Sequence, residues 1–262
     1  MSMMKVVILA GGFGTRLSEE TDVLPKPMIE IGGKPILWHI MKIYSHYGFN
    51  DFIICLGYKG YCIKEYFAHY YLHCSDITFD FSSNNEMTIH EHKAEPWKVT
   101  LVDTGLETMT GGRVKKIQRF IGNNPFMLTY GDGVSDINIV NLANFHKRKK
   151  KIATLTSFNL SEQFGVIDSN NKDEIISFQE KPRNKNSWVN IGFFVFEPEI
   201  FNYISDEQTV LEREPLKALV EEKQLISYKH YGFWKAMDAL RDKRELEKLW
   251  SSGEPPWKIW KD

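Results

Sequence analysis

Apolar residues recur along this chain in short runs, and segments with a helical spacing of apolar positions lie between them. The strand-like runs are at residues 6–10, 52–56, 126–130, 153–158 and 192–196. Helical patterns span residues 36–47 and 139–150. This alternation predicts βαβ units with right-handed crossovers. The expected fold is α/β, with a doubly wound, mostly parallel, Rossmann-like sheet.

Two regions depart from the alternation. Residues 70–113 interleave polar and aromatic side chains with little helical period, which predicts a small β-rich insertion in a single domain of residues 1–262. The tail 238–262 has helical character at first and then reaches two prolines that stop a helix. Trp257 and Trp260 follow, and two interpretations stay open: they pack on their own subunit, or they contact another subunit.

Composition limits the classes of protein to consider. A chain of 262 residues with 42% hydrophobic content can bury a substantial core, and a net charge of -1 argues against nucleic acid as the main partner. Three cysteines without a CxxC pair indicate a reducing compartment. Neither a signal peptide nor an apolar run near the ~20 residues of a membrane span is found, so we expect a cytoplasmic protein.

The segment 8–28, ILAGGFGTRLSEETDVLPKPM, carries the strongest chemical signal. Gly11, Gly12 and Gly14 follow the first predicted strand, and such a loop lets backbone N–H groups approach an anion. A dinucleotide fingerprint would need a third glycine where Leu17 stands, and the Gly-Lys-Ser/Thr ending of a Walker loop is missing. Taken alone, the glycines are equally consistent with a tight strand-to-helix turn.

Two positively charged residues favour the anion-binding loop over a simple turn. Arg16 offers a planar fork of donors that fits phosphate oxygens, and Lys26 offers a compact charge. Pro25 and Pro27 hold Lys26 on a stiff backbone, because each fixes its own φ and restricts the residue before it. Together with the glycine loop, these residues predict a triphosphate site.

Residues 11–28 match every fixed position of GGxGTRLxxxTxxxPKP[ML], and the chain resembles the sugar-1-phosphate nucleotidylyltransferases over nearly its whole length. Within that family it looks closest to members that convert CTP and glucose 1-phosphate to CDP-glucose and pyrophosphate. The resemblance implies Mg²⁺ as cofactor, a homo-oligomer, and a product used in surface polysaccharide biosynthesis. It implies nucleotide-binding residues at Leu9, Ala10, Gly11, Gly12, Phe13, Gly14, Thr15, Arg16, Lys26, Thr108, Arg113 and Gly131.

Two aspartates are candidate metal ligands. Asp132 lies between two glycines directly after the run 126–130, where it is either a metal ligand or part of an Asp-Gly turn. Mg²⁺ prefers hard oxygen ligands and needs only one or two carboxylates. Asp238 precedes a helical pattern, so from the sequence alone it is equally a metal ligand or a helix N-cap. The resemblance favours the metal for both aspartates.

The sugar site is expected around the motif FQEKP at 178–182, which resembles the sugar-binding element of the family. The resemblance implies that Glu180 accepts hydrogen bonds from sugar hydroxyls and that Lys181 neutralises the sugar phosphate; a surface ion pair is the alternative. Relatives carry an NGGFF-like sequence downstream. Here Asn190 and Gly192 remain as candidate sugar contacts, and Ile191 is a departure that affects the shape of the pocket.

The segment 102–114, VDTGLETMTGGRV, resembles the element that separates cytidylyl from thymidylyl and uridylyl enzymes. Thr108, Thr110 and Arg113 are candidates for contacts with base, ribose or phosphate, whereas Gly111 and Gly112 could instead mark a hairpin turn. Cytosine presents an amine where uracil and thymine present a carbonyl, so its recognition requires a hydrogen-bond acceptor.

The expected reaction is in-line attack of the sugar phosphate on the α-phosphorus of CTP. Arg16, Lys26 and Asp132 are the expected catalytic residues, and they act by positioning and charge neutralisation. The alternatives are a thymidylyl- or uridylyltransferase acting on the same sugar phosphate, or a non-catalytic nucleotide-sugar sensor. The histidine pairs have no third ligand nearby in sequence and are expected to be structural.

Overall fold

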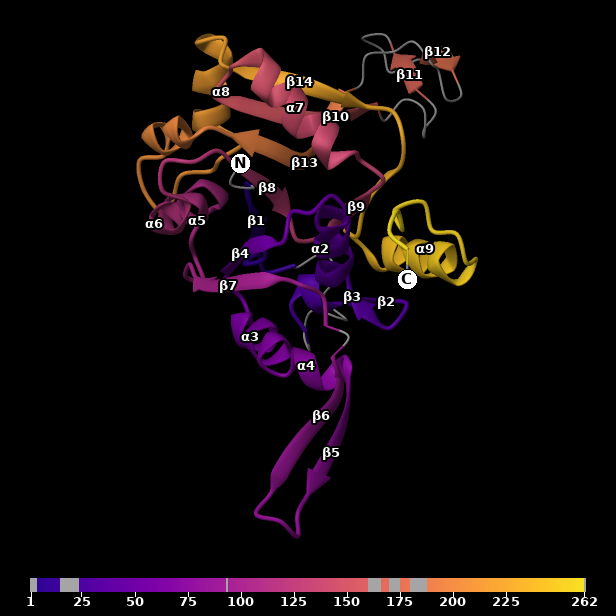
Figure 1. The fold of residues 1–262 in the computed structure, drawn as a ribbon. Helices are drawn as coiled ribbons and strands as arrows, with labels where there is room; N and C mark the ends of the chain where they lie inside the picture. Colours follow the sequence, from indigo (N-terminus) through magenta and orange to yellow (C-terminus); the bar gives the residue numbers. More distant parts are fainter. Residues whose placement is uncertain are drawn as a thin grey trace.

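A seven-stranded sheet runs through the centre of the molecule, in the order β14-β10-β13-β8-β1-β4-β7 (Figure 1). The computed structural model describes residues 4–14, 24–92, 94–159, 166–169, 175–179 and 188–261. The strands of the sheet are β1 (Lys5–Leu9), β4 (Asp51–Leu56), β7 (Lys98–Asp103), β8 (Phe126–Tyr130), β10 (Ala153–Asn159), β13 (Trp188–Phe196) and β14 (Leu225–His230).

The predicted sheet of mostly parallel strands is confirmed, with one exception. β1 pairs in parallel with β4 and β8, β4 with β7, and β10 with β14. β13 is antiparallel to both of its neighbours, β8 and β10. In the described chain only the hairpin of β11 (Val166–Ser169) and β12 (Ile175–Gln179) lies between β10 and β13. β13 thus runs beside β10 in the opposite direction.

Helices cover both faces of the sheet. They are η2 (Lys26–Met28), α2 (Ile36–His46), α3 (Gly60–Ala68), α4 (Tyr70–His73), α5 (Thr110–Lys116), α6 (Gln118–Ile121), α7 (Ile139–Lys149), η4 (Pro198–Tyr203), α8 (Glu214–Glu221) and α9 (Leu240–Ser251). Along β1, Val6 and Ile8 join the core under α2, α7 and α9, whereas Val7 and Leu9 join the core under α5, α6 and α8. Both faces of β1 are therefore buried, which explains its continuous apolar run.

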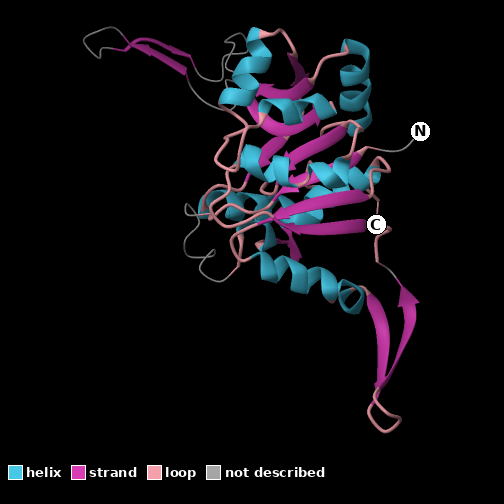
Figure 2. Cartoon of the chain, turned by 90° about the vertical axis from the view of Figure 1, so that its left-hand side faces the viewer, coloured by secondary structure: helices cyan, strands magenta, loops and turns pink. Residues whose placement is uncertain are grey.

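Shorter strands form hairpins and ladders around this body. β5 (Ser75–Asp80) and β6 (Glu86–His92) make a ribbon that projects away from the sheet (Figures 1 and 2). The rest of the segment predicted as an insertion is part of the central α/β structure. β7 is an edge strand of the seven-stranded sheet, and α5 packs on that sheet. β2 (Glu30–Ile31) pairs with β3 (Lys34–Pro35), and β9 (Gly133–Ser135) pairs with β15 (Trp234–Ala236). Among the described residues, no helix combines the length and apolar character needed to cross a bilayer.

The C-terminal tryptophans pack within their own chain. After α9 the chain folds back so that Trp257 and Trp260 are buried against α2, where Trp260 meets Trp38 edge to face at 5.7 Å between ring centroids. Trp257 stacks on Phe233 at 5.8 Å. The first of the two interpretations is thus confirmed. Rings buried in this way leave little surface with which to contact another subunit.

The same aromatic cluster holds a buried histidine in its neutral form. His39 Nε2 lies 2.8 Å from the carbonyl oxygen of Ile31, and Trp257 Nε1 donates to His39 Nδ1 at 3.3 Å. This arrangement assigns the proton to Nε2 and leaves Nδ1 as an acceptor. Burial lowers the pKa of His39 to about 4. A second proton would face the indole N–H and lose that hydrogen bond.

We therefore expect acid to destabilise the protein through His39. Because the pKa of His39 is lower in the folded state, its contribution to stability is complete above pH ~6.5 and is lost as the pH falls toward about 4. The expected loss at pH 4.5 is about 2–3 kcal/mol of unfolding free energy. Urea unfolding at pH 7 and 4.5 measures it, with His39→Gln as the comparison. An equal pH dependence in this variant would contradict the assignment.

Candidate active site

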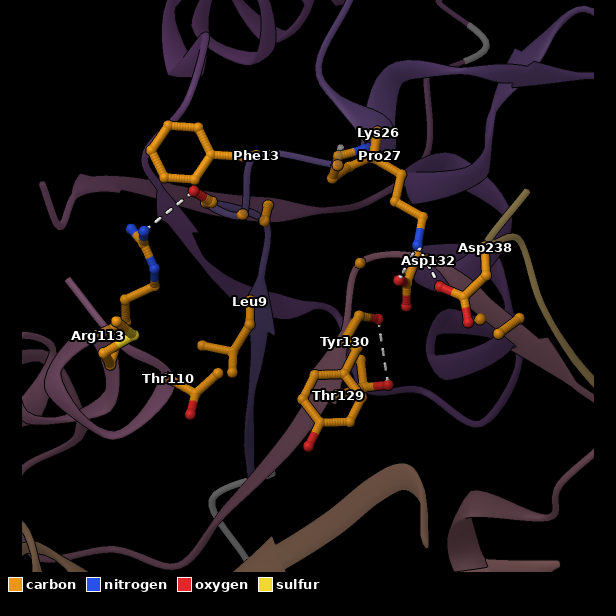
Figure 3. A pocket seen from close by; sticks show the side chains of 18 of the residues that line it. Leu9, Phe13, Lys26, Pro27, Thr110, Arg113, Thr129, Tyr130, Asp132 and Asp238 are labelled. Carbon is orange, nitrogen blue, oxygen red and sulfur yellow. Dashed lines mark hydrogen bonds and ion pairs between the residues drawn. The ribbon is translucent and has the colours of Figure 1, made fainter. Parts of the chain in front are cut away.

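A cavity of about 610 Å³ opens at the carboxyl ends of β1 and β8 (Figure 3). Ligands bind at this edge of open α/β sheets. Of the residues predicted from the sequence, the cavity is lined by Leu9, Ala10, Gly11, Gly12, Phe13, Gly14, Lys26, Thr108, Thr110, Arg113, Gly131, Asp132, Asn190 and Asp238. The predicted residues Thr15, Arg16, Glu180 and Lys181 lie outside the described part of the chain.

The ladder between β9 and β15 brings the two candidate metal ligands together. Gly133 pairs with Ala236, and the backbone N–H of Met237 donates to the carbonyl oxygen of Asp132 at 2.8 Å. Asp132 precedes β9 and Asp238 follows β15, so both acids lie at the same end of this antiparallel pair. Two acids far apart in the sequence thus face one point of the cavity.

Asp238 is not a helix cap, so that interpretation is wrong. Ala239 occupies the N-cap position of α9. The carboxylate that serves the helix terminus is Asp242, whose Oδ2 accepts the backbone N–H groups of Asp238 at 3.1 Å and Ala239 at 2.9 Å. The side chain of Asp238 points into the cavity instead (Figure 3).

Lys26 lies between the two aspartates. Its Nζ is 2.6 Å from Asp132 Oδ2 and 2.8 Å from Asp238 Oδ1 (Figure 3). The lysine begins η2, which follows Pro25 in an extended conformation at φ -66° and ψ 147°. Burial acts to lower the pKa of Lys26, but the charge of Asp132 and the hydrogen bonds to both aspartates outweigh it, so the pKa is raised. Lys26 is therefore positively charged.

The donor set at this point suits Mg²⁺. Asp132 and Asp238 both contact the same cation, Lys26 Nζ. The side chains of the two aspartates are 28% and 39% exposed, so both are more accessible from the cavity than the lysine side chain, which is 12% exposed. Within the described residues, no group of three or more His, Cys, Asp or Glu side chains could hold a metal ion. Two carboxylates, with water and substrate phosphate completing the shell, are what Mg²⁺ commonly uses.

Arg113 is engaged with the protein backbone. Its Nη1 donates to Leu56 O, Thr104 Oγ1 and Gly105 O at 2.7–3.0 Å, and its Nη2 donates to Gly11 O at 3.0 Å and Leu106 O at 3.1 Å. The buried guanidinium thereby ties the glycine loop to the end of β4 and to the loop before α5. This geometry favours a positioning role over the direct nucleotide contact expected from the sequence.

The same contact explains why residue 11 is glycine. A Cβ on Gly11 would lie 2.3 Å from Arg113 Nη1, which is far inside contact distance. The sequence predicted an anion-binding loop or a tight turn at these glycines, and Gly11 in addition makes room for the guanidinium.

Removing the guanidinium of Arg113 is expected to lower the stability of the folded protein. Arg113→Met would remove five hydrogen bonds that the buried guanidinium makes within the protein, and we expect a loss of about 3–5 kcal/mol of unfolding free energy. Arg119→Met, which removes an exposed arginine from the ring of Phe120, is the matched control and should cost under ~1 kcal/mol. Urea denaturation measures both variants. Equal losses would show that the buried hydrogen bonds are not responsible.

The hairpin-turn alternative for Gly111 and Gly112 is wrong, because both residues lie in the first turn of α5. Before that helix, Thr108 is buried and its Oγ1 lies 3.3 Å from Lys116 Nζ. Thr110 Oγ1 donates to Glu212 Oε2 at 2.6 Å. Thr110 therefore lines the cavity with its hydroxyl already engaged.

Glu212 is a candidate residue that the sequence did not indicate. It also accepts a hydrogen bond from the hydroxyl of Tyr130, the last residue of β8. Burial raises the pKa of Tyr130, so this hydroxyl keeps its proton and can donate. Glu212 stands in no recognisable motif, and only the fold brings it into contact with Thr110 and Tyr130, which line the cavity.

The two predicted sugar contacts have different surroundings. Asn190 lines the cavity, and its Oδ1 accepts the backbone N–H of Gly192 at 3.0 Å. Gly192 has φ +81°, and a Cβ there would lie 2.2 Å from Cδ2 of Tyr130. Gly192 is thus required for the packing of the tyrosine ring. Ile191, the departure from the family pattern, is buried and lines the cavity.

Comparison with known proteins identifies the family. A family model described as Nucleotidyl transferase matches residues 5–245. The chain is 54% identical over 258 residues to a glucose-1-phosphate cytidylyltransferase of Salmonella typhimurium, which covers 98% of this chain and 100% of that protein. The chain therefore belongs to the nucleotidyl transferase family, and the predicted enzyme class is confirmed.

Solved structures agree with this fold. UDP-glucose pyrophosphorylase in complex with UDP-glucose matches with a TM-score of 0.68 at 19% identity, over 96% of this chain and 99% of that one. HddC from Yersinia pseudotuberculosis matches with a TM-score of 0.66 at 20% identity, over 95% of this chain and 100% of that one. Similarity at this level supports the fold alone.

Proposed function

We propose that this protein transfers the cytidylyl group of CTP to glucose 1-phosphate, giving CDP-glucose and pyrophosphate. The observation that carries the proposal is the 54% identity, over 98% of this chain and 100% of the relative, to an enzyme named for this reaction. The geometry supports it, because one cavity combines a glycine loop, a lysine and two acids. A triphosphate substrate with a divalent cation requires these groups.

In the proposed mechanism a phosphate oxygen of glucose 1-phosphate attacks the α-phosphorus in line. A new P–O bond forms as the bond to the β-phosphate breaks, and the electron pair leaves with pyrophosphate. The attacking oxygen is already anionic, so the chain needs no strong general base. Its task is to align the two phosphates and offset their charge.

Each polar residue of the site has a proposed part. The backbone of residues 11–14 and Arg16 hold the triphosphate, and Lys26 neutralises the reacting phosphate. Asp132 and Asp238 would hold Mg²⁺. When bound, Mg²⁺ supplies positive charge against the phosphate oxygens. The sugar phosphate pairs with Lys181, and the sugar hydroxyls bind to Glu180 and Asn190.

The other end of the cavity suits a nucleotide base. Phe13, Leu106 and Met109 line the cavity with exposed apolar side chains, and the ring of Phe13 lies away from Asp132 and Asp238 (Figure 3). Arg113 fixes the carbonyl groups of Gly105 and Leu106 in the adjoining loop. Each carbonyl oxygen has a second lone pair, so such a group can accept the amine of cytosine.

Pyrophosphate release with glucose 1-phosphate and each of CTP, UTP, dTTP and GTP tests the proposal. We expect kcat/KM for CTP to exceed that for UTP by about 100-fold or more, since an unmatched buried polar group is costly. A preference for UTP or dTTP would support the uridylyl or thymidylyl alternative. Release with none of the nucleotides would support a non-catalytic sensor.

We further propose a cytoplasmic homo-oligomer whose product feeds surface polysaccharide synthesis. Cys55, Cys62 and Cys74 are free thiols, as is usual in a reducing compartment. The projecting hairpin exposes Phe79 and Phe81, and a two-stranded ribbon alone is marginally stable in water. Light scattering of the purified protein measures the number of subunits.

A further inference from the structure

The ammonium of Lys26 lies where a metal ion would be bound. Asp132 Oδ2 and Asp238 Oδ1 both lie within 2.8 Å of Lys26 Nζ (Figure 3). Mg²⁺ binds oxygen at about 2.0–2.1 Å, so an ion held by these two oxygens would lie directly beside Nζ. Two cations this close repel strongly, so the same two oxygens are not expected to hold both.

We infer that Lys26 is an exchangeable internal cation, which holds Asp132 and Asp238 together in the free enzyme and leaves them for the nucleotide phosphates when a divalent cation binds. The inference rests on the proposed function and extends it. It adds that the Lys26 ammonium and the divalent cation occupy the two aspartates one after the other.

The exchange requires movement of a side chain alone. Pro25 and Pro27 restrict the backbone on either side of Lys26, whereas the four-carbon stem of a lysine rotates freely. Lys26 lines the same cavity as the glycine loop. An ammonium that leaves the carboxylates therefore stays in the space where the triphosphate is proposed to bind.

The charges give the exchange a consequence for binding. Two carboxylates and one ammonium sum to a negative cluster, which repels a triphosphate. With a divalent cation on the carboxylates and the ammonium released, the same groups sum to a positive cluster. Lys26 should thus weaken metal binding in the free enzyme and couple it to nucleotide binding, with reciprocal effects on both affinities.

Manganese binding without nucleotide tests this directly. Free Mn²⁺ is measured by electron paramagnetic resonance during titration of the wild-type protein and of Lys26→Met. We expect the variant to bind Mn²⁺ about 10-fold more tightly, because the competing ammonium is gone. The matched control is Lys98→Met, which removes an ammonium 3.1 Å from Asp51 on the edge of the sheet and should change nothing.

Two more variants protect the test against misfolding. Lys26→Gln is expected to behave like Lys26→Met, and Lys26→Arg, which keeps the positive charge, should bind Mn²⁺ no more tightly than the wild type. Near-ultraviolet circular dichroism identifies the folded variants. Unchanged or weaker Mn²⁺ binding in a folded neutral variant overturns the inference.

The coupling between metal binding and nucleotide binding provides a second test of the exchange. With an α,β-methylene analogue of CTP, the Mn²⁺ affinity of the wild type should rise more than that of Lys26→Met, and equal rises would contradict the exchange. Failure of the proposed function would give a different experimental result from failure of the exchange. No pyrophosphate release with any nucleotide would refute the reaction, whereas the nucleotide-free Mn²⁺ comparison would still decide the role of Lys26.

Discussion

Asp132→Asn is expected to lower kcat for pyrophosphate release about 10³-fold while changing the Kd for CTP less than ~5-fold. The amide keeps the shape of the carboxylate but removes the charge that binds a cation beside the reacting phosphates. An effect confined to kcat indicates an interaction made chiefly in the transition state. Steady-state assays with saturating Mg²⁺, together with calorimetric titration of CTP, measure the two quantities.

The control for this variant is Asp51→Asn. Asp51 also pairs with a lysine, Lys98, but it lies at the start of β4, at the opposite end of the strand from the cavity. Its kcat should stay within about 2-fold of the wild type, as is usual for a surface ion pair. Wild-type turnover in Asp132→Asn would remove Asp132 from the mechanism.

Lys26→Met is expected to slow the chemical step about 10²–10³-fold, since the ammonium would no longer offset charge on the reacting phosphate. A single-turnover experiment with enzyme in excess of CTP isolates this step from product release. Lys98→Met is again the control and should react at the wild-type rate. If the single-turnover rate of Lys26→Met is unchanged, Lys26 does not contribute to the chemistry.

This loss of rate and the gain in Mn²⁺ affinity expected for Lys26→Met are separate effects. The same ammonium opposes the metal in the free enzyme and assists the phosphate in the complex. A variant with tighter metal binding and slower chemistry would show both roles, whereas an ammonium that only bound phosphate would change the rate alone.

Arg113 shows how a residue can be found from the sequence while its contacts within the protein cannot. An arginine near a predicted phosphate loop suggests a contact with the nucleotide. In the fold, five acceptors of the protein surround its Nη atoms, and Gly11 is small enough to let them approach. The sequence reveals the charge, but the surrounding loops determine its partners.

Local pattern was sufficient for much of the fold. The runs at 6–10, 52–56 and 126–130 became β1, β4 and β8, because a strand buried on both faces requires continuous apolar residues. The direction of β13 did not follow from its composition, since apolar runs look alike in parallel and antiparallel strands. Only the pairing of β13 with β8 and β10 in the packed sheet shows it.

The sequence by itself determined the class of site: a glycine loop after the first strand, a lysine held between prolines, and an acid directly after β8. These features are local, and backbone geometry and neighbouring residues fix them. Only the tertiary structure decided that Asp238 lies beside Asp132 across the β9–β15 ladder and that Lys26 bridges them. It also decided that Glu212 accepts a hydrogen bond from the hydroxyl of Tyr130. Such contacts join residues far apart in the chain, and their geometry exists only after the core has packed.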